Sequence, residues 1–257
     1  MTPQLGGAWN AEEMTSPQLP SAPVSSSARG TTVAAGPDAT GHVLVLPGGG
    51  YAGHAENEAE PVAAWLRRLG LSASVLRYPV RTAHPAPLDA VRAEIRALRS
   101  SGVERIALLG SSAGGHLAGH AALTAPPGAT ERVDAAILCY PVVSMELDTH
   151  QGSRRELLGA DPSAAARTAT SLDRLVTADA PPFFIWHTAD DASVPVQHSY
   201  LLAQALARAG TPHALHVFPA GPHGLGLATG SEEPEVWPEL CASWLAALGW
   251  PAGRRGR

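Results

Sequence analysis

Residues 105–114 read RIALLGSSAG, an apolar run of strand length that ends in the pattern Gly-x-Ser-x-Gly. Residues 116–123 then follow a helical pattern, so Ser112 lies where a strand turns sharply into a helix. Such a turn holds its central residue in a strained conformation, and the flanking glycines leave room for strand and helix to approach. This context favours Ser112 as a nucleophile over a serine in an ordinary turn.

A serine hydroxyl is a poor nucleophile at neutral pH, and it needs a histidine to take its proton and a carboxylate to orient that histidine. Of the 11 histidines, His223 alone lies on a Gly/Pro-rich loop after the last expected strand, 214–218. His216 lies inside that strand and His213 precedes it. We therefore expect His223 to be the base rather than a surface-loop histidine.

The carboxylate has two candidates, Asp190 and Asp191, on the loop that follows the expected buried strand 183–186. We favour Asp191 because it lies three residues before Val194, where the next helix is expected to begin, whereas Asp190 fits a turn-forming or capping role. The resulting chain order, serine then aspartate then histidine, is that of the α/β-hydrolases and differs from the chymotrypsin and subtilisin orders.

A further site element follows the short apolar run 43–46, where the chain reads PGGGY. Negative charge builds on the carbonyl oxygen during acyl transfer and must meet preorganised N–H donors. Consecutive glycines let backbone amides point at a ligand without side chains in the way. We expect the N–H groups of Gly49, Gly50 and Ala113 to form an oxyanion hole, and we place Tyr51 in the substrate pocket.

Between about Val43 and Trp250 a set of motifs resembles the acetyl esterase and acetylxylan-esterase-like branch of the α/β-hydrolases. The motifs are PGGGY at 47–51 with Glu58 beyond it, LRY at 76–78, GSSAGGHL at 110–117, YPV at 140–142, GSR at 152–154 with LLG at 157–159, HT at 187–188 with Asp191 and VP at 194–195, and HG at 223–224. Many esterases carry His-Gly-Gly-Gly in the oxyanion loop. Here Pro47 precedes the glycines, a form similar to the acetyl-esterase branch rather than the hormone-sensitive-lipase branch.

The resemblance implies that Ser112, Asp191 and His223 form the catalytic triad of an α/β-hydrolase fold, a mostly parallel sheet flanked by helices on both faces. It also implies a serine esterase that removes acetyl or another short acyl group from a sugar or small alcohol. The same triad would serve an amidase such as an arylformamidase, or a small peptidase. A non-catalytic ligand-binding protein of this fold is a further alternative.

Composition agrees with a soluble enzyme, since 257 residues with 45% apolar and 16% charged residues can bury one sizeable core. A net charge of -5 argues against nucleic acid as a partner. All 18 basic residues are arginine, which excludes a Ser-Lys dyad and a pyridoxal-phosphate Schiff base. We expect no cofactor, a small-molecule ester as the partner, and a monomer or homodimer.

Other patterns are interpreted as structural. Glycines 48, 50 and 53 match a dinucleotide fingerprint, but no helix is expected to begin within that loop. His116 and His120 have the spacing of a zinc pair without a third ligand, so we expect no metal. Cys139 and Cys241 fit buried apolar positions, and no apolar run is long enough for a signal peptide or membrane span, so we expect a cytoplasmic protein without membrane contact.

The organisation along the chain is simple. Residues 1–40 are rich in Ser, Pro, Thr, Ala and Gly and are expected to be extended, and residues 41–252 form a single α/β-hydrolase domain. Residues 144–179 interrupt the alternation as a small lid-like insertion. The expected strands are 43–46, 73–77, 105–109, 135–139, 183–186 and 214–218, and the expected helices are 59–69, 86–100, 113–123, 196–209 and 235–248.

Overall fold

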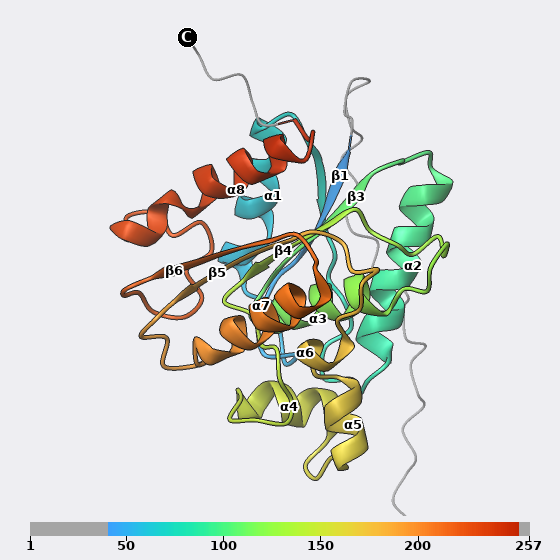
Figure 1. Cartoon of the computed structure of the whole chain (residues 1–257), viewed down its shortest axis with the longest axis vertical. Coiled ribbons are helices and arrows are strands. Elements are labelled where there is room, and N and C mark those ends of the chain that lie inside the picture. The colour runs from blue at the N-terminus through green and yellow to red at the C-terminus, as the bar shows by residue number, and fades with distance from the viewer. Residues whose placement is uncertain (1–40, 252–257) are drawn as a thin grey trace, which may run out of the picture.

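A computed structural model describes residues 41–251, and the segment 1–40, expected to be extended, lies outside the described residues. At its centre is a six-stranded sheet in the order β2-β1-β3-β4-β5-β6, in which every neighbouring pair is parallel (Figure 1). The strands are β1 (His42–Leu46), β2 (Ser72–Val75), β3 (Ile106–Ser111), β4 (Ala135–Cys139), β5 (Phe183–Thr188) and β6 (His213–Phe218).

Helices cover both faces of this sheet, so the predicted fold class is confirmed. Apolar residues of α2, α3 and α7 pack on one face, and those of α1 and α8 pack on the other. The helices are α1 (Glu60–Arg68), α2 (Ala86–Ser100), α3 (Ala113–Thr124), α4 (Gln151–Leu158), α5 (Ala164–Ala169), α6 (Leu172–Leu175), α7 (Gln197–Ala209) and α8 (Trp237–Ala247), with 3-10 turns η1 (Glu56–Glu58) and η2 (Glu233–Val236).

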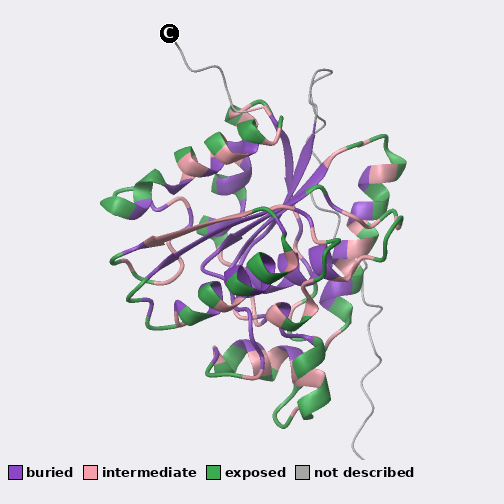
Figure 2. Ribbon diagram, in the orientation of Figure 1, coloured by how far each residue is buried: buried purple, intermediate pink, exposed green. Residues whose placement is uncertain are grey.

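The sequence of the strands explains this sandwich of helices and sheet. In β1, Leu44 and Leu46 contact the core on the α3 side, while Val43 and Val45 contact the core on the α1 side. Successive strand residues point to opposite faces, so a strand buried on both faces must be apolar at every position. Figure 2 shows that the central strands are buried along their length. This burial explains why the sequence of each central strand is a short continuous apolar run.

Parallel strands bring the loops that follow β1, β3, β5 and β6 to one edge of the sheet. These loops carry the glycines of PGGGY, Ser112, the two aspartates and His223 in that order. Ligands of open α/β sheets bind in the crevice outside the carboxyl ends of the strands. The topology therefore collects every sequence-predicted site segment at this edge.

Residues 144–179 contain α4 and α5, which lie beyond this edge of the sheet, and α6, which packs against α3 and α7 (Figure 1). The segment is tied to the body by backbone and side-chain bonds: Leu172 N–H donates to the Val143 carbonyl (2.9 Å), and His116 Nε2 on α3 donates to the Thr170 carbonyl (2.7 Å). Across residues 41–251, the chain forms no helix with both the length and the apolar character needed to traverse a bilayer.

Candidate active site

The turn between β3 and α3 has the strained geometry that the Gly-x-Ser-x-Gly pattern predicts. Ser112 has φ 53° and ψ −118°, a left-handed conformation that is rare for residues with a side chain. A Cβ atom on Gly114 would clash with the carbonyl oxygens of Leu46 and Pro47, and one on Gly110 would clash with the backbone of Gly114. The glycines are therefore required by the close approach of strand and helix.

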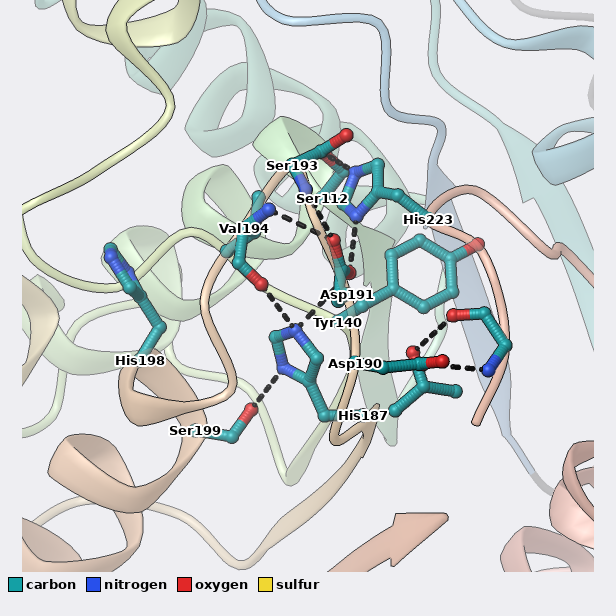
Figure 3. A network of polar contacts seen from close by, with 12 residues as sticks. Ser112, Tyr140, His187, Asp190, Asp191, Ser193, Val194, His198, Ser199 and His223 are labelled. Atoms are coloured by element: carbon teal, nitrogen blue, oxygen red, sulfur yellow. Dashed lines mark hydrogen bonds and ion pairs between the residues drawn. The ribbon is translucent and has the colours of Figure 1, made fainter. Parts of the chain in front are cut away.

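Ser112, His223 and Asp191 come together in hydrogen-bond order (Figure 3). His223 Nδ1 lies 2.6 Å from Asp191 Oδ2, and because a carboxylate can only accept, this nitrogen donates. His223 Nε2 is then free to accept the hydroxyl proton of Ser112, whose Oγ lies 2.8 Å away. Asp190 instead accepts the N–H of Gly221 (2.8 Å), a loop-forming contact. This arrangement can move a proton from the serine to the histidine.

The Asp191 carboxylate has more partners than the triad alone requires. Its Oδ1 accepts the N–H groups of Ser193 (2.8 Å) and Val194 (2.9 Å). Burial would raise the pKa of Asp191, but hydrogen bonds from His187, His223 and Val194 outweigh it and hold the pKa well below its ordinary value. Asp191 therefore stays ionised and fixed beside His223.

His187 is a supporting residue whose role the sequence analysis did not predict. Its Nε2 lies 2.9 Å from the Val194 carbonyl and 3.3 Å from Asp191 Oδ2, so this nitrogen is a donor, and its Nδ1 lies 2.7 Å from Ser199 Oγ (Figure 3). The only sequence signal was its place at the end of β5 in the motif that also contains Asp191.

The glycine loop presents free amides to the nucleophile. Gly49 and Gly50 have φ 122° and 66°, which glycine adopts readily. Within the part of the chain that the structure describes, their N–H groups have no protein acceptor, and Ala113 N–H is at the first position of α3, where no intrahelical partner exists. Gly49 and Gly50 line the same cavity as Ser112, and Ala113 follows Ser112 directly in the chain, so the three amides keep the oxyanion-hole role as a prediction.

Glu58 holds the glycine loop in place through hydrogen bonds. Its Oε2 accepts the N–H of Gly48 (2.7 Å), and its Oε1 accepts the hydroxyl of Tyr140 (2.8 Å), which in turn accepts the N–H of Gly226 (2.8 Å). Burial raises the pKa of Glu58 despite these hydrogen bonds. The carboxylate thus links the glycine loop, the end of β4 and the His223 loop. The sequence analysis named Glu58 only as part of a motif and did not predict this linking role.

Tyr51 does not lie where the sequence analysis placed it. Its side chain is fully buried, and its hydroxyl lies 2.7 Å from His116 Nδ1. His116 Nε2 donates to the Thr170 carbonyl (2.7 Å), so Nδ1 accepts the proton of the Tyr51 hydroxyl. The expectation that Tyr51 lines the substrate pocket is corrected, because the core provides the partner that satisfies its hydroxyl.

A cavity of about 380 Å³ opens over Ser112 and His223. Small residues from the glycine loop line it, together with side chains from the 144–179 segment that the sequence did not mark as site residues. The lining residues are Gly49, Gly50, Ala52, Ala55, Asn57, Glu58, Ser112, His150, Gly152, Glu156, Ser193, His223 and Gly224. Within residues 41–251, no group of three or more His, Cys, Asp and Glu side chains is arranged to hold a metal ion.

The parallel sheet, the strained serine turn and the Ser-His-Asp arrangement together define an α/β-hydrolase. The chain belongs to the prolyl oligopeptidase family, whose model matches residues 90–248.

Solved structures with this fold include esterases. An acetyl ester-xyloside bifunctional hydrolase from Caldicellulosiruptor lactoaceticus is 39% identical with a TM-score of 0.81, over 85% of this chain and 86% of that chain. A carboxylesterase from Lactobacillus plantarum is 29% identical with a TM-score of 0.73, over 83% of this chain and 88% of that chain.

Two curated relatives are longer proteins. Endo-1,4-beta-xylanase B of Butyrivibrio fibrisolvens is 36% identical over 206 residues, which are 72% of this chain and 32% of the relative. A probable carboxylic ester hydrolase of Mycobacterium tuberculosis is 32% identical over 191 residues, 63% of this chain and 44% of the relative. The chain thus spans less than half the length of either relative.

Proposed function

We propose that this chain is a carboxylic ester hydrolase that cleaves short acyl esters, in particular acetyl esters of a sugar or small alcohol, through an acyl-enzyme on Ser112. The observation that carries the proposal is the unbroken hydrogen-bond chain from Ser112 Oγ through His223 to Asp191, open to a cavity beside free amides. The esterase names of the similar structures support ester rather than other acyl substrates.

The reaction follows from the positions of these groups. Ser112 Oγ attacks the ester carbonyl carbon while its proton passes to His223 Nε2, and the negative oxygen is stabilised by the amides of Gly49, Gly50 and Ala113. The carbon–oxygen bond to the alcohol then breaks, and the alcohol leaves with the proton from His223. His223 Nε2 then takes a proton from water as the water oxygen attacks the acyl carbonyl carbon. The bond from that carbon to Ser112 Oγ breaks while His223 returns the proton to Oγ, and the acid is released.

A small acyl group agrees with the dimensions of the site. The cavity measures about 380 Å³ and must hold both the acyl and the alcohol part of the ester. Acetyl esters also agree with the hydrolase from Caldicellulosiruptor lactoaceticus, which is described as acting on an acetyl ester. The small-molecule partner, a monomeric or dimeric assembly and a cytoplasmic location stay predictions.

Amide hydrolysis is the second candidate, favoured by the name of the matching family, which includes peptidases. An amidase, an arylformamidase or a small peptidase would use the same serine, histidine and oxyanion amides. A non-catalytic binding protein agrees less well, since such a protein has no need of the complete hydrogen-bond chain.

Hydrolysis of p-nitrophenyl acetate, butyrate and octanoate, and of acetylated xylose, tests the proposal. We expect turnover to fall with acyl length and to drop by at least about a thousandfold in Ser112→Ala, because the nucleophile is lost. A rapid-quench mass measurement should find an acetyl group on Ser112 in the wild type. Undiminished turnover in Ser112→Ala, or preference for acetanilides and peptides over esters, would contradict the ester proposal.

A further inference from the structure

We propose that His150 and Glu156 form a subsite for the alcohol part of the ester, which selects uncharged, hydroxyl-bearing alcohols and disfavours anionic ones. The proposal rests on the proposed esterase function, and it assigns substrate selection to α4 and the residue before it. Both side chains line the cavity over Ser112, and neither takes part in the acyl-transfer steps.

The hydrogen bonds of His150 leave one N–H free for a ligand. As the N-cap of α4, its Nδ1 accepts the N–H of Ser153 (3.2 Å) and also lies 2.8 Å from Ser153 Oγ. An accepting Nδ1 carries no proton, so the neutral ring is protonated at Nε2. Burial lowers the pKa of His150, which keeps the ring neutral at pH 7. Within residues 41–251 this Nε2 has no partner.

The ring of His150 lies close to the reacting atoms. A Cβ atom on Gly50 would be 3.4 Å from His150 Cε1, so the ring borders the glycine loop that provides the oxyanion amides. A hydroxyl on the alcohol carbon next to the ester oxygen could therefore accept a hydrogen bond from Nε2 while the carbonyl oxygen occupies the oxyanion hole.

Glu156 supplies the complementary acceptor. It lies four residues after Gly152 on α4, and residues at this spacing share one face of a helix. The side chain is half-buried, and within the described chain its carboxylate has neither a hydrogen bond nor an ion pair. Several other carboxylates are paired with arginine, namely Glu56, Glu60, Glu131 and Glu146.

The negative charge of the cavity lining explains why esters of anionic alcohols are disfavoured. Its lining contains the carboxyl groups of Glu58 and Glu156 but no arginine. A carboxylate accepts hydrogen bonds from neighbouring hydroxyls and repels a negatively charged group at short range. A polyol ester therefore gains contacts here, whereas an ester of a carboxylate-bearing alcohol is repelled.

The subsite is preformed because α4 is fixed to the body. The N–H of His84 donates to the Leu157 carbonyl (2.9 Å), and His198 Nε2 on α7 donates to the Asp148 carbonyl just ahead of α4 (2.8 Å). Ser153, which receives the contact of His150, is fully buried. A preorganised site has a smaller ordering cost on binding.

The test compares kcat/KM on three acetyl esters: acetylated xylose, p-nitrophenyl acetate, and the anion acetoxyacetate. Loss of a hydrogen bond to a charged group lowers affinity about tenfold or more, so Glu156→Gln should raise KM for the xylose ester by roughly that factor. Turnover of p-nitrophenyl acetate should stay within about twofold, because that ester has no hydroxyl to bind. The acetoxyacetate ester should be cleaved faster, because the repelling charge is gone.

His150→Asn is the second variant, since asparagine is a good N-cap that keeps an acceptor for Ser153 N–H while removing the Nε2 donor. We expect about a fivefold to tenfold higher KM for the xylose ester, the loss of one neutral hydrogen bond. Arg155→Ala is the matched control, because Arg155 is an exposed neighbour on α4 outside the cavity lining, and it should leave all three substrates unchanged.

The outcomes separate this proposal from the esterase function. Equal losses on all three esters in both variants, or an unchanged preference between them, would overturn the subsite while leaving the esterase intact. A wild type that cleaves p-nitrophenyl acetate but not acetylated xylose would do the same. A wild type inactive on every ester would overturn both proposals.

Discussion

The polar groups on one side of the cavity are paired with one another, whereas those on the other side have no partner in the described part of the chain. On the sheet side, Ser112, His223 and Asp191 bond to one another, and Asp191 is further held by backbone amides. On the α4 side, the Nε2 of His150 and the carboxylate of Glu156 have no partner within residues 41–251. Both side chains are half-buried and line the cavity, so these groups remain available to pair with a ligand.

The difference indicates how the two tasks are divided. Reacting atoms must be held in position before the ester arrives, because misplacement by about 1 Å costs as much as a hundredfold in rate. Recognition of the alcohol needs donors and acceptors that become paired only on binding. Substitutions on the sheet side should therefore lower kcat for every ester, in contrast to the selective effects expected for the α4 side.

Among the substitutions on the sheet side, Asp191→Asn should lower kcat/KM the most. An asparagine amide presents N–H groups where Asp191 now accepts from His223, His187 and two backbone amides, so His223 is held in the wrong tautomer. We expect kcat/KM for p-nitrophenyl acetate at pH 7.5 to fall about ten-thousandfold. Initial rates with active-site titration provide the measurement.

Asp190→Asn is the matched control, because the adjacent carboxylate only accepts the Gly221 N–H. It should change kcat/KM by less than about tenfold, the effect of one exposed loop contact. A larger loss in Asp190→Asn than in Asp191→Asn would reverse the assignment of the triad acid.

The same Asp191 variant provides a pH test. The pKa of Asp191 is lower in the folded protein than its ordinary value, so folding favours the ionised form. Its contribution to the free energy of unfolding is complete above the unfolded pKa, about 3.9, and is lost as the pH falls below it. Urea unfolding should show the difference between wild type and Asp191→Asn at its largest near pH 6 and shrinking between pH 4 and 3. A constant difference would contradict a lowered pKa.

The sequence was sufficient to predict which side chains meet on the sheet side, because its signals there are local. The strained turn at Ser112 needs glycines at fixed offsets, and the parallel sheet brings the ends of apolar runs to one edge whatever lies between them. The helix predicted at 86–100 is α2, and the strand predicted at 135–139 is β4. Alternating and apolar patterns define such long, well-separated elements best.

The sequence was insufficient where distant segments meet. The burial of Tyr51 depends on His116, 65 residues away, and His150, the N-cap of α4, borders Gly50 of the glycine loop, which is far from it in the sequence. The 3-10 turn at Glu233–Val236, ahead of α8, is too short for periodicity to predict, so the helix expected at 235–248 begins at Trp237. Tertiary contacts, rather than local preference, determine these features.

Glu58→Gln should have a smaller effect on the sheet side. The substitution replaces one acceptor oxygen by an NH2 group, so either Gly48 N–H or the Tyr140 hydroxyl loses its partner and the glycine loop shifts. An unpaired buried donor costs about 1–3 kcal/mol, which corresponds to roughly tenfold to a hundredfold in kcat when the oxyanion amides move. Steady-state kinetics on p-nitrophenyl acetate and acetylated xylose should show equal reductions.

Glu60→Gln is the control for this change, because Glu60 is exposed and paired only with Arg67. Exposed ion pairs contribute little, so its kcat should be that of the wild type. A Glu58→Gln enzyme with normal kcat but higher KM for the xylose ester would instead place Glu58 on the recognition side of the comparison.

Tyr51→Phe should have the smallest effect on turnover and tests how far the paired network extends from the reacting atoms. The change leaves His116 Nδ1 buried without its donor, which should lower the free energy of unfolding by about 1–3 kcal/mol. Tyr200→Phe, at a 40% exposed position on α7, should leave stability unchanged.

Because the Tyr51 side chain is buried in the core and does not line the cavity, kcat/KM of Tyr51→Phe should fall by no more than about threefold, less than the loss of one hydrogen bond in the transition state. Unchanged stability with a raised KM for the ester would mean that Tyr51 contacts the substrate. The measured pair of effects therefore distinguishes a residue that supports the loop through the core from one that binds ligand at the cavity.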